Sequence, residues 1–477
     1  MFRDDFVWGV ASSSYQIEGT RHEDDRGVCT WDVFTEGDAK KTRGDNGKVA
    51  CDHINRYKED FALMKELGIK NYRFSINWCR IIPNGTGKVS EKGIALYRDM
   101  ILEMKKNGIE PYLTMYHWEL PQALEDKGGW LNPGIVDAFA EYAKVVAENF
   151  TDICDKIITV NEPQCVVGLG YCTGVHAPGK KLELKDTFQI AHNLLKAHGA
   201  AVIALRKYAV RPIEVGYAPT CTIPLPVSNN REDVEAAREK FFRMSFSNNW
   251  AWNIPWFADP VLLGKYPEQG MELYKDYLPE ITDEDMKLIH QPLDFVGFNI
   301  YNGYYIKGTK DGDIIDVSPK KGYAETAVSW AVQDDCLYWG AKFAYERYHL
   351  PIYITENGMA SCDWVSLDGC VHDPARIDFL DRYISKLQQI YDEGVDIRGY
   401  FLWTFMDNFE WDQGYHGRYG IVYTDFETLE RIPKDSAYWY KEVMQTNGAT
   451  LSINRIPDIV KKTSYEIQRT KIERKES

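Results

Sequence analysis

Short runs of apolar, β-branched and aromatic residues recur along the chain, separated by longer amphipathic stretches. Most of the runs are nearly continuous in apolar residues, which is typical of strands covered on both faces. The pattern predicts eight strands, at residues 6–11, 71–78, 110–118, 156–163, 214–221, 294–301, 351–358 and 397–405.

The stretches between these runs have helical spacing. In residues 53–68, apolar positions recur at steps of three and four, and Gly68 then supplies a C-terminal stop. We expect helices within residues 53–68, 89–108, 132–150, 186–208, 231–252, 334–350 and 373–394. Eight alternating strands and helices predict an α/β fold, a single-domain (β/α)8 TIM barrel; an open doubly wound sheet is the alternative.

The predicted barrel fills most of the chain. No linker, low-complexity tract or sharp change of composition interrupts it before the C-terminal tail. We therefore expect one domain over residues 1–452, with elaborated strand-to-helix loops such as 222–230 and 302–329. Residues 453–477 form a C-terminal extension that we expect to be partly disordered, because chain ends without docking contacts fray.

Composition narrows the classes of partner. The formal net charge of −15 gives an acidic surface, which repels nucleic acid and anionic membranes. The first residues lack a basic segment followed by a long apolar run, and no apolar stretch approaches the roughly 18 residues of a membrane span. We expect a cytoplasmic protein with no nucleic-acid or membrane partner. The sequence leaves the oligomeric state open.

Cysteine and histidine spacing argues against metal and redox chemistry. None of the ten cysteines forms a CxxC pair, so free thiols in a reducing compartment are expected. Disulfides Cys165–Cys172 and Cys362–Cys370 are the alternatives. The ten histidines are scattered and form no HExxH motif, and no glycine-rich nucleotide loop follows a strand. We expect no metal and no cofactor.

Two glutamates stand at the ends of predicted strands. Glu162 follows the fourth strand, within Asn161-Glu162-Pro163, and Glu356 closes the seventh. In a barrel of this kind active groups project from the carboxyl ends of strands. A single such glutamate is more often a structural cap, but two facing carboxylates are what cleavage of a glycosidic bond requires.

Four segments carry a family resemblance: FVWGVASSSYQIEG (6–19), TVNEP (159–163), YITENG (353–358) and WTFMDNFEW (403–411). Together they resemble glycoside hydrolase family 1, the β-glucosidase family, from Phe6 to about Met444. The resemblance implies a retaining enzyme that cleaves terminal non-reducing β-D-glucosyl residues, with galactosyl and fucosyl residues as further substrates. Its partner would be a small-molecule β-glycoside or an oligosaccharide.

The resemblance also implies roles for individual residues. Glu162 matches the general acid/base and Glu356 the nucleophile, supported by Arg73, Asn161 and Tyr301. Retention requires the two carboxyl groups to lie about 5–5.5 Å apart. The pKa of Glu162 should be raised, whereas Glu356 needs cationic or hydrogen-bonding neighbours. The residues expected to bind the substrate are Gln16, His117, Trp118, Asn299, Trp330, Trp403, Glu410, Trp411 and Tyr419.

Two other functions remain as alternatives. A 6-phospho-β-glucosidase of the same family would bind the phosphate with a serine, a lysine and a tyrosine. Glu410 and Gly417 stand at the first two of these positions, and only Tyr419 is retained. A carboxylate facing a phosphate would be repulsive. A catalytically inactive sugar-binding homologue is the second alternative, and such proteins usually lose one of the two carboxylates.

Overall fold

The protein is built around a closed barrel of eight parallel strands. The structure, a computed structural model, describes residues 1–19, 25–37 and 39–467. The barrel strands are β1 (Val7–Ala11), β2 (Asn71–Ser75), β3 (Glu110–Tyr116), β4 (Lys156–Asn161), β5 (Glu214–Ala218), β7 (Phe295–Gly308), β9 (Ile352–Asn357) and β10 (Ile397–Trp403). Neighbours in this order pair in parallel, and β10 pairs with β1 to close the ring. The eight predicted strands and the (β/α)8 barrel are confirmed.

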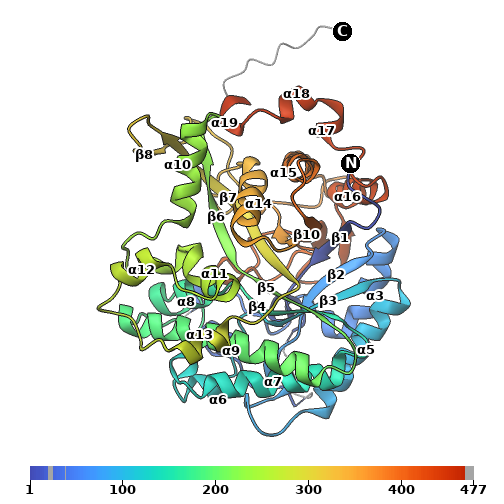
Figure 1. Cartoon of the computed structure of the whole chain (residues 1–477). Coiled ribbons are helices and arrows are strands. Elements are labelled where there is room, and N and C mark those ends of the chain that lie inside the picture. Colours follow the sequence, from blue (N-terminus) through green and yellow to red (C-terminus); the bar gives the residue numbers. More distant parts are fainter. Residues whose placement is uncertain (20–24, 38, 468–477) are drawn as a thin grey trace.

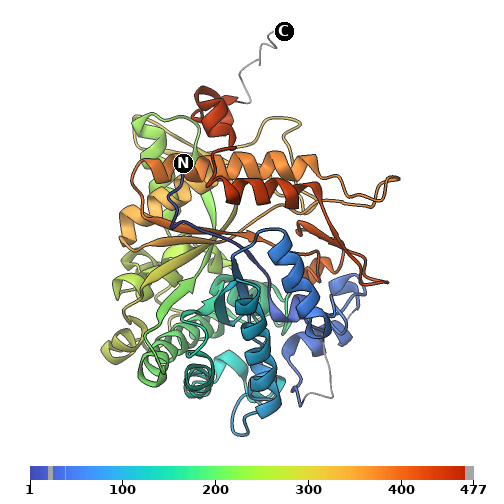
Figure 2. The ribbon, with the colours of Figure 1, turned by 90° about the vertical axis from the view of Figure 1, so that its right-hand side faces the viewer.

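Helices cover the outside of the barrel (Figures 1 and 2). The longest are α3 (His53–Glu66), α5 (Glu91–Lys106), α7 (Ile135–Phe150), α9 (Leu184–Tyr208), α10 (Arg231–Phe242), α14 (Asp335–Tyr348), α15 (Pro374–Asp392) and α16 (Asp435–Gln445). The expected helix over 231–252 is wrong beyond Phe242. The chain is extended at Arg243, and the serines and asparagines that follow compete with helical hydrogen bonds.

Shorter elements occupy the connections between strands and helices. These are α1 (Ser14–Ile17), α2 (Thr30–Gly37), η2 (Ala39–Thr42), α4 (Trp78–Ile81), α6 (Gln122–Glu125), η3 (Gly129–Leu131), α8 (Pro163–Val167), η4 (Gly168–Thr173), η5 (Trp250–Trp252), α11 (Ile254–Leu263), α12 (Glu268–Leu273), α13 (Asp283–Ile289), η6 (Trp411–Gln413), β11 (Val422–Thr424) and β12 (Arg431–Pro433).

Two segments expected to be loops contain strands instead. β6 (Thr220–Pro226) pairs in parallel with β7, and β8 (Ile314–Val317) pairs with β7 in the antiparallel sense. β7 is long enough to reach both, because it continues beyond the barrel to Gly308. The sheet therefore extends past the barrel on one side, and this extension carries part of the wall of the cavity described below.

Aromatic side chains fill the interior of the barrel. The rings of Tyr112 and Phe401 lie 4.8 Å apart between centroids, and those of Phe295 and Tyr353 lie 5.0 Å apart. Phe295 and Tyr353 come from the beginnings of their strands, so these rings close the barrel towards its amino-terminal end. The barrel is a packed core there, and open space remains at the carboxyl end.

Three short helices follow α16 across the outer surface: α17 (Ser452–Arg455), α18 (Pro457–Val460) and α19 (Ser464–Ile467), in red in Figure 1. The backbone nitrogen and hydroxyl of Ser452 each donate to the Asp381 carboxylate on α15, at 2.7 Å. The division of the chain at residue 452 stays a prediction. The partial disorder expected for residues 453–477 includes residues 468–477, which lie outside the described residues.

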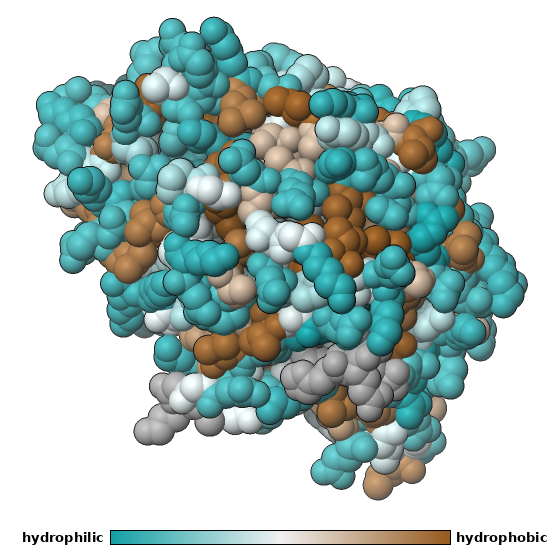
Figure 3. Space-filling model, turned by 90° about the horizontal axis from the view of Figure 1, so that it is seen from below, coloured by the Kyte–Doolittle hydropathy of each residue, from teal (hydrophilic) through white to brown (hydrophobic). Residues whose placement is uncertain are grey.

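The surface is largely polar, with hydrophobic side chains scattered among hydrophilic ones on the face in Figure 3. All ten cysteines are free thiols, as expected, so neither alternative disulfide is formed. Within the described residues, no helix has the length and apolar character needed to cross a membrane.

Candidate active site

A cavity of about 550 Å³ lies at the carboxyl end of the barrel. The predicted site residues that line it are His117, Trp118, Glu162, Tyr301, Trp330, Glu356, Trp403, Glu410, Trp411 and Tyr419. The remaining four lie behind these and hydrogen-bond to them: Gln16 to Glu410, Arg73 to Glu356, Asn161 to His117 and Asn299 to Glu162. The fold thus brings every predicted site residue together.

Glu162 stands at the junction between β4 and α8. Its backbone is left-handed, with φ 45° and ψ 66°, a conformation that residues other than glycine seldom adopt and that is often found at functional sites. The side chain is buried. Its Oε1 accepts from Asn299 Nδ2 at 2.7 Å, and its Oε2 accepts from the Cys165 thiol at 3.0 Å.

Glu356 is the fifth residue of β9 and is also buried. Its Oε1 accepts from Arg73 Nη1 at 2.5 Å, and its Oε2 accepts from the Tyr301 hydroxyl at 2.7 Å. Arg73 lies on β2 and Tyr301 on β7, so strands on different sides of the barrel supply these donors. A buried carboxylate is stable when it is paired with a cation and hydrogen-bonded, and Glu356 meets both conditions.

A series of hydrogen bonds through Arg73, Asn161 and Asn299 connects the two carboxylates. Arg73 Nη2 donates to Asn161 Oδ1 at 2.6 Å, and Asn299 Nδ2 donates to the same oxygen at 3.0 Å. Asn299 Oδ1 accepts from the Thr355 hydroxyl at 2.6 Å, which fixes the orientation of the amide. Arg73, Asn161 and Asn299 each hydrogen-bond to the groups before and after them in this series. The network therefore holds the site in a fixed geometry without a ligand.

The surroundings of the two carboxylates differ in charge. Burial, with the nearby charge of Glu356, raises the pKa of Glu162 to about 7. Burial also raises the pKa of Glu356, but the Arg73 guanidinium and the Tyr301 hydroxyl oppose that rise. The neutral donors Asn299 and Cys165 face Glu162, whereas a cation faces Glu356. The arrangement therefore favours a proton on Glu162 and a negative charge on Glu356.

A second set of polar groups in and behind the cavity wall, around Glu410 and His117, is held in fixed orientations. Gln16 Nε2 donates to the Phe409 carbonyl at 2.9 Å and to Glu410 Oε2 at 3.3 Å. Burial, together with the carboxylates of Asp412 and Glu356, raises the pKa of Glu410 well above its ordinary value. Burial and the charge of Arg73 hold the pKa of His117 well below its ordinary value, so its ring is neutral. Such groups match the hydroxyls of a neutral sugar.

Aromatic rings form the walls between these polar groups. His117 stacks on Trp403, with ring centroids 5.7 Å apart, and Trp118 packs on Trp411 at 4.7 Å. Trp330 is 39% exposed and lies against Tyr301, so it forms the outer rim. Flat apolar walls with a few fixed polar groups are typical of a site for a small molecule.

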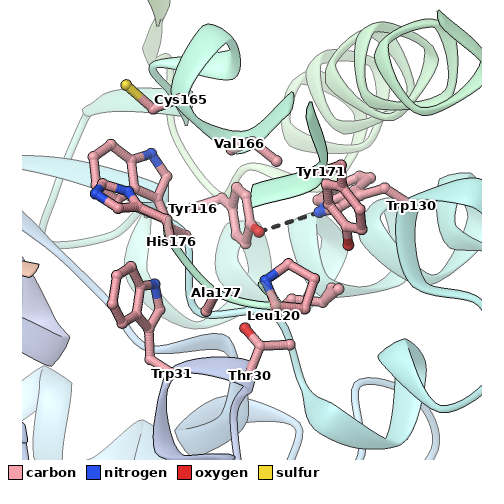
Figure 4. Close-up of a pocket in the computed structure, with 12 residues that line it drawn as sticks. Thr30, Trp31, Tyr116, Leu120, Trp130, Cys165, Val166, Tyr171, His176 and Ala177 are labelled. Carbon is pink, nitrogen blue, oxygen red and sulfur yellow. Dashed lines mark hydrogen bonds between the residues drawn. The ribbon is translucent and has the colours of Figure 1, made fainter. Parts of the chain in front are cut away.

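A much smaller cavity of about 10 Å³ lies behind this wall and shares Trp118, Cys165 and His176 with it (Figure 4). Within it, Trp130 Nε1 donates to the Tyr116 hydroxyl at 3.1 Å. Its volume is about that of one water molecule. The wall of the active-site cavity is therefore backed by closely packed side chains.

The sequence interpretation missed several lining residues. Cys165 hydrogen-bonds to Glu162, and its position three residues later, one helical turn away, was the available indication. His176 Nε2 lies 3.3 Å from Asp412 Oδ1, a contact between residues far apart in the chain that no local pattern reveals. Thr220, Cys221 and Thr222 line the cavity from β6; the first two fall at the end of the strand predicted over 214–221, and Thr222 falls in the loop expected over 222–230.

Among the described residues, no group of three or more histidine, cysteine, aspartate or glutamate side chains is arranged to hold a metal ion. The chemistry that this site can perform is proton transfer by one buried carboxyl group and nucleophilic attack by another. A (β/α)8 barrel with such a pair at its carboxyl end defines the class of glycoside hydrolases.

Comparisons with known proteins agree with this class. The family model for Glycosyl hydrolase family 1 matches residues 1–449. β-Glucosidase A of Thermotoga maritima is 44% identical over 448 residues, covering 94% of this chain and 98% of that protein. β-Glucosidase A of Acetivibrio thermocellus is 42% identical over 453 residues, covering 94% and 99%.

Solved structures give the same result. The Thermotoga maritima β-glucosidase in complex with glucoimidazole superposes with a TM-score of 0.85 at 43% identity, covering 94% of this chain and 99% of that one. The same enzyme in complex with deoxynojirimycin also has a TM-score of 0.85. The chain belongs to glycosyl hydrolase family 1 and is a glycoside hydrolase.

Proposed function

We propose that the protein is a retaining β-glucosidase that removes terminal non-reducing β-D-glucosyl residues, with β-galactosyl and β-fucosyl residues as further substrates. The observation that carries the proposal is the unequal pair of carboxylates. Glu356 is bound by Arg73 and Tyr301, whereas burial raises the pKa of Glu162 to about 7. The names of the relatives, β-glucosidases at 42–44% identity, support the sugar assignment.

In the proposed reaction, Glu356 attacks the anomeric carbon while the bond from that carbon to the glycosidic oxygen breaks. Glu162 transfers its proton to the departing oxygen, which leaves as an alcohol. A water molecule then attacks the anomeric carbon of the glycosyl-enzyme, Glu162 takes the proton of the water, and the carboxylate of Glu356 is released. Two inversions at the same carbon give net retention.

The sugar-binding roles follow from the positions of the fixed polar groups. We assign Gln16, His117 and Glu410 to the outer hydroxyls and Asn161 to the 2-hydroxyl, next to the acid. Trp118, Asn299, Trp330, Trp403, Trp411 and Tyr419 complete the substrate-binding set. Asn161 Oδ1 already accepts from Arg73 and Asn299, and Asn161 Nδ2 lies 3.2 Å from His117 Nε2, so the network fixes the direction of the remaining amide hydrogen.

A phosphate on the 6-hydroxyl is disfavoured because a glycine, not a lysine, stands at position 417. Glu410 lines the cavity, and a side chain added at Gly417 would come within 3.0 Å of Glu410. Arg418, the nearest candidate cation in the sequence, pairs with Asp407 at 2.7 Å and packs on the ring of Tyr423.

A cytoplasmic location stays a prediction of the sequence pattern.

Azide rescue of two matched variants tests the assignment, since each variant removes one carboxylate and leaves room for the anion. In Glu356→Gly, azide replaces the nucleophile and attacks from the face opposite the leaving group, so an activated β-glucoside should yield the α-glucosyl azide. In Glu162→Gly, the glycosyl-enzyme still forms and azide displaces Glu356, so the product should be the β-glucosyl azide. Nuclear magnetic resonance of the products distinguishes the two anomers.

Several outcomes would contradict the proposal. Exchanged products would mean that the roles of the two glutamates are reversed, and no azide product from either folded variant would exclude double displacement. The wild-type enzyme is assayed in parallel on 4-nitrophenyl β-glucoside and on its 6-phosphate. Hydrolysis of the phosphate alone would support the phosphoglycosidase, and hydrolysis of neither would support the inactive sugar-binding homologue.

A further inference from the structure

The hydrogen bond between Cys165 and Glu162 has no part in the proposed bond making and bond breaking. Cys165 lies in the first turn of α8, and its backbone nitrogen donates to the Glu162 carbonyl at 3.0 Å. Its thiol donates to Glu162 Oε2 at 3.0 Å, short for a sulfur donor. The thiol is therefore held against the carboxyl group by both backbone and side chain.

The two oxygens of Glu162 face donors of different kinds. Oε1 faces the Nδ2 of Asn299, and the Asn299 amide cannot turn over without losing the bond from Thr355 to its Oδ1. Because Oε1 always meets a fixed N–H, a proton on Glu162 belongs on Oε2. Oε2 faces the thiol, whose S–H can rotate, so that sulfur either donates to the carboxylate or accepts from the carboxylic acid.

This inference rests on the proposed acid/base role of Glu162, in which the same group gives up a proton in one step and takes one in the next. We propose that Cys165 is a positioning residue for Glu162: its rotatable thiol holds Oε2 in place in both protonation states and favours the ionised one. The thiol takes no part in bond making. It lies at the wall of the cavity, and its sulfur points away from the small cavity behind it (Figure 4).

The charges and hydrogen bonds around Glu162 determine in which direction its pKa changes when the Cys165 thiol is removed. Burial and Glu356 raise the pKa of Glu162, and the bonds from Cys165 and Asn299 and the charge of Arg73 lower it. Burial raises the pKa of Cys165 itself well above its ordinary value, so it stays a neutral donor. The titratable and charged groups facing Glu162 from the surrounding elements are Glu356, Arg73, Tyr301, Cys221, Tyr419 and Cys165. Removing the thiol donor should leave Glu162 protonated to higher pH.

The test compares the pH profiles of Cys165→Val and Cys165→Ser with that of the wild type. Valine fills the site without a donor, whereas serine restores a donor. The quantity measured is the pH at which kcat/KM falls on the alkaline side, or alkaline limb, of the profile. The substrate is phenyl β-glucoside, whose phenol is a poor leaving group. We expect the limb to move up by about 0.5 to 1 pH unit in Cys165→Val and to stay at or below the wild-type position in Cys165→Ser.

Two controls separate this effect from a general disturbance. Cys154 is a buried thiol near the amino-terminal end of β4, away from the cavity, and it donates to the Pro111 carbonyl at 3.4 Å, so Cys154→Val should leave the limb in place. With 2,4-dinitrophenyl β-glucoside, which needs no protonation, the Cys165 variants should show no shift. Cys165→Ala provides a second donor-free variant if valine impairs folding, and the limb should move up in it too.

An unshifted limb in the folded donor-free variants, or equal shifts in Cys165→Val and Cys165→Ser, would overturn the proposal. A wrong acid/base assignment for Glu162 would give a different experimental result. In that case the wild-type limb itself would not depend on the leaving group, and Glu162→Gly would give no β-glucosyl azide.

Discussion

Glu162 and Glu356 are the same residue type, and their neighbours give them different chemistry. Glu356 meets the Arg73 guanidinium at 2.5 Å, and Glu162 meets the neutral groups of Asn299 and Cys165. Burial raises the pKa of both, but only Glu356 has a cation in contact to oppose the rise. The proposed division of labour is therefore decided by neighbouring side chains on β2, β7 and α8, not by the two glutamates themselves.

The raised pKa of Glu162 predicts a pH dependence that varies with the leaving group. Glu162 holds its proton below about pH 7, so kcat/KM on phenyl β-glucoside should be lost as the pH rises through about 7. The Glu162→Gln variant should slow this substrate by about 10²- to 10⁴-fold and flatten the limb. Initial rates on phenyl and 2,4-dinitrophenyl glucosides across the pH range measure both effects. Equal losses on the two substrates would contradict the acid role.

At the scale of elements, the ends of β9 and β10 hold Glu356 and a wall of the cavity together. Gly358 follows β9 directly, and a Cβ atom there would lie 1.8 Å from the backbone oxygen of Trp403, at the end of β10. A backbone atom cannot move aside as a flexible side chain can. The glycine of the Thr355–Gly358 motif is therefore required by close packing of two strands, and it lies two residues after Glu356.

Gly358→Ala should consequently disturb both stability and catalysis. The added methyl group would push the two strand ends apart, at a cost of about 1–3 kcal/mol in the free energy of unfolding, and would displace Glu356 and Trp403. Thermal unfolding and the kcat on 4-nitrophenyl β-glucoside provide the measurements. Gly37→Ala is the matched control, because a Cβ there meets nothing within 4 Å. Wild-type values for Gly358→Ala would refute the argument.

Elements were predictable where the pattern is local. Apolar runs identified all eight barrel strands, since each strand is covered on both faces. The helix expected over 231–252 ends at Phe242, and most of β6 and all of β8 fall in the expected loops 222–230 and 302–329. β6 and β8 exist because β7 extends to Gly308 and offers hydrogen bonds, and such pairing between distant segments leaves no local trace in the sequence.

At the scale of the whole molecule, the helices α17–α19 connect the chain end to α14 and α15. The buried ammonium of Lys386 donates to the Lys462 carbonyl at 2.5 Å and pairs with Asp335 at 2.8 Å. The Ser464 hydroxyl donates to Asp334 at 2.6 Å, and its backbone nitrogen donates to Asp335. Two adjacent buried carboxylates thus depend on these helices for hydrogen bonds.

Truncation after residue 451 should therefore lower the stability of the fold. Asp334, Asp335 and Lys386 would lose partners and be hydrated only in part, and each such group costs about 1–3 kcal/mol. Differential scanning calorimetry should show a lower unfolding midpoint. Lys461→Ala, at an exposed position in the same segment, should not change it. A truncated protein with the wild-type midpoint would show that the helices contribute nothing to stability.

The sequence alone determined the barrel, the positions of the two glutamates at strand ends and the family, because periodicity and motifs depend on residues close in the chain. Tertiary structure alone decided which groups touch them. Arg73 and Glu356 lie on β2 and β9, and only closure of the barrel by β10 and β1 brings such strands around one cavity. The raised pKa of Glu162, the hydrogen bonds of Asn161 and Asn299, and the thiol contact all depend on burial and angstrom-scale distances, which side chains acquire only when the barrel is closed and packed.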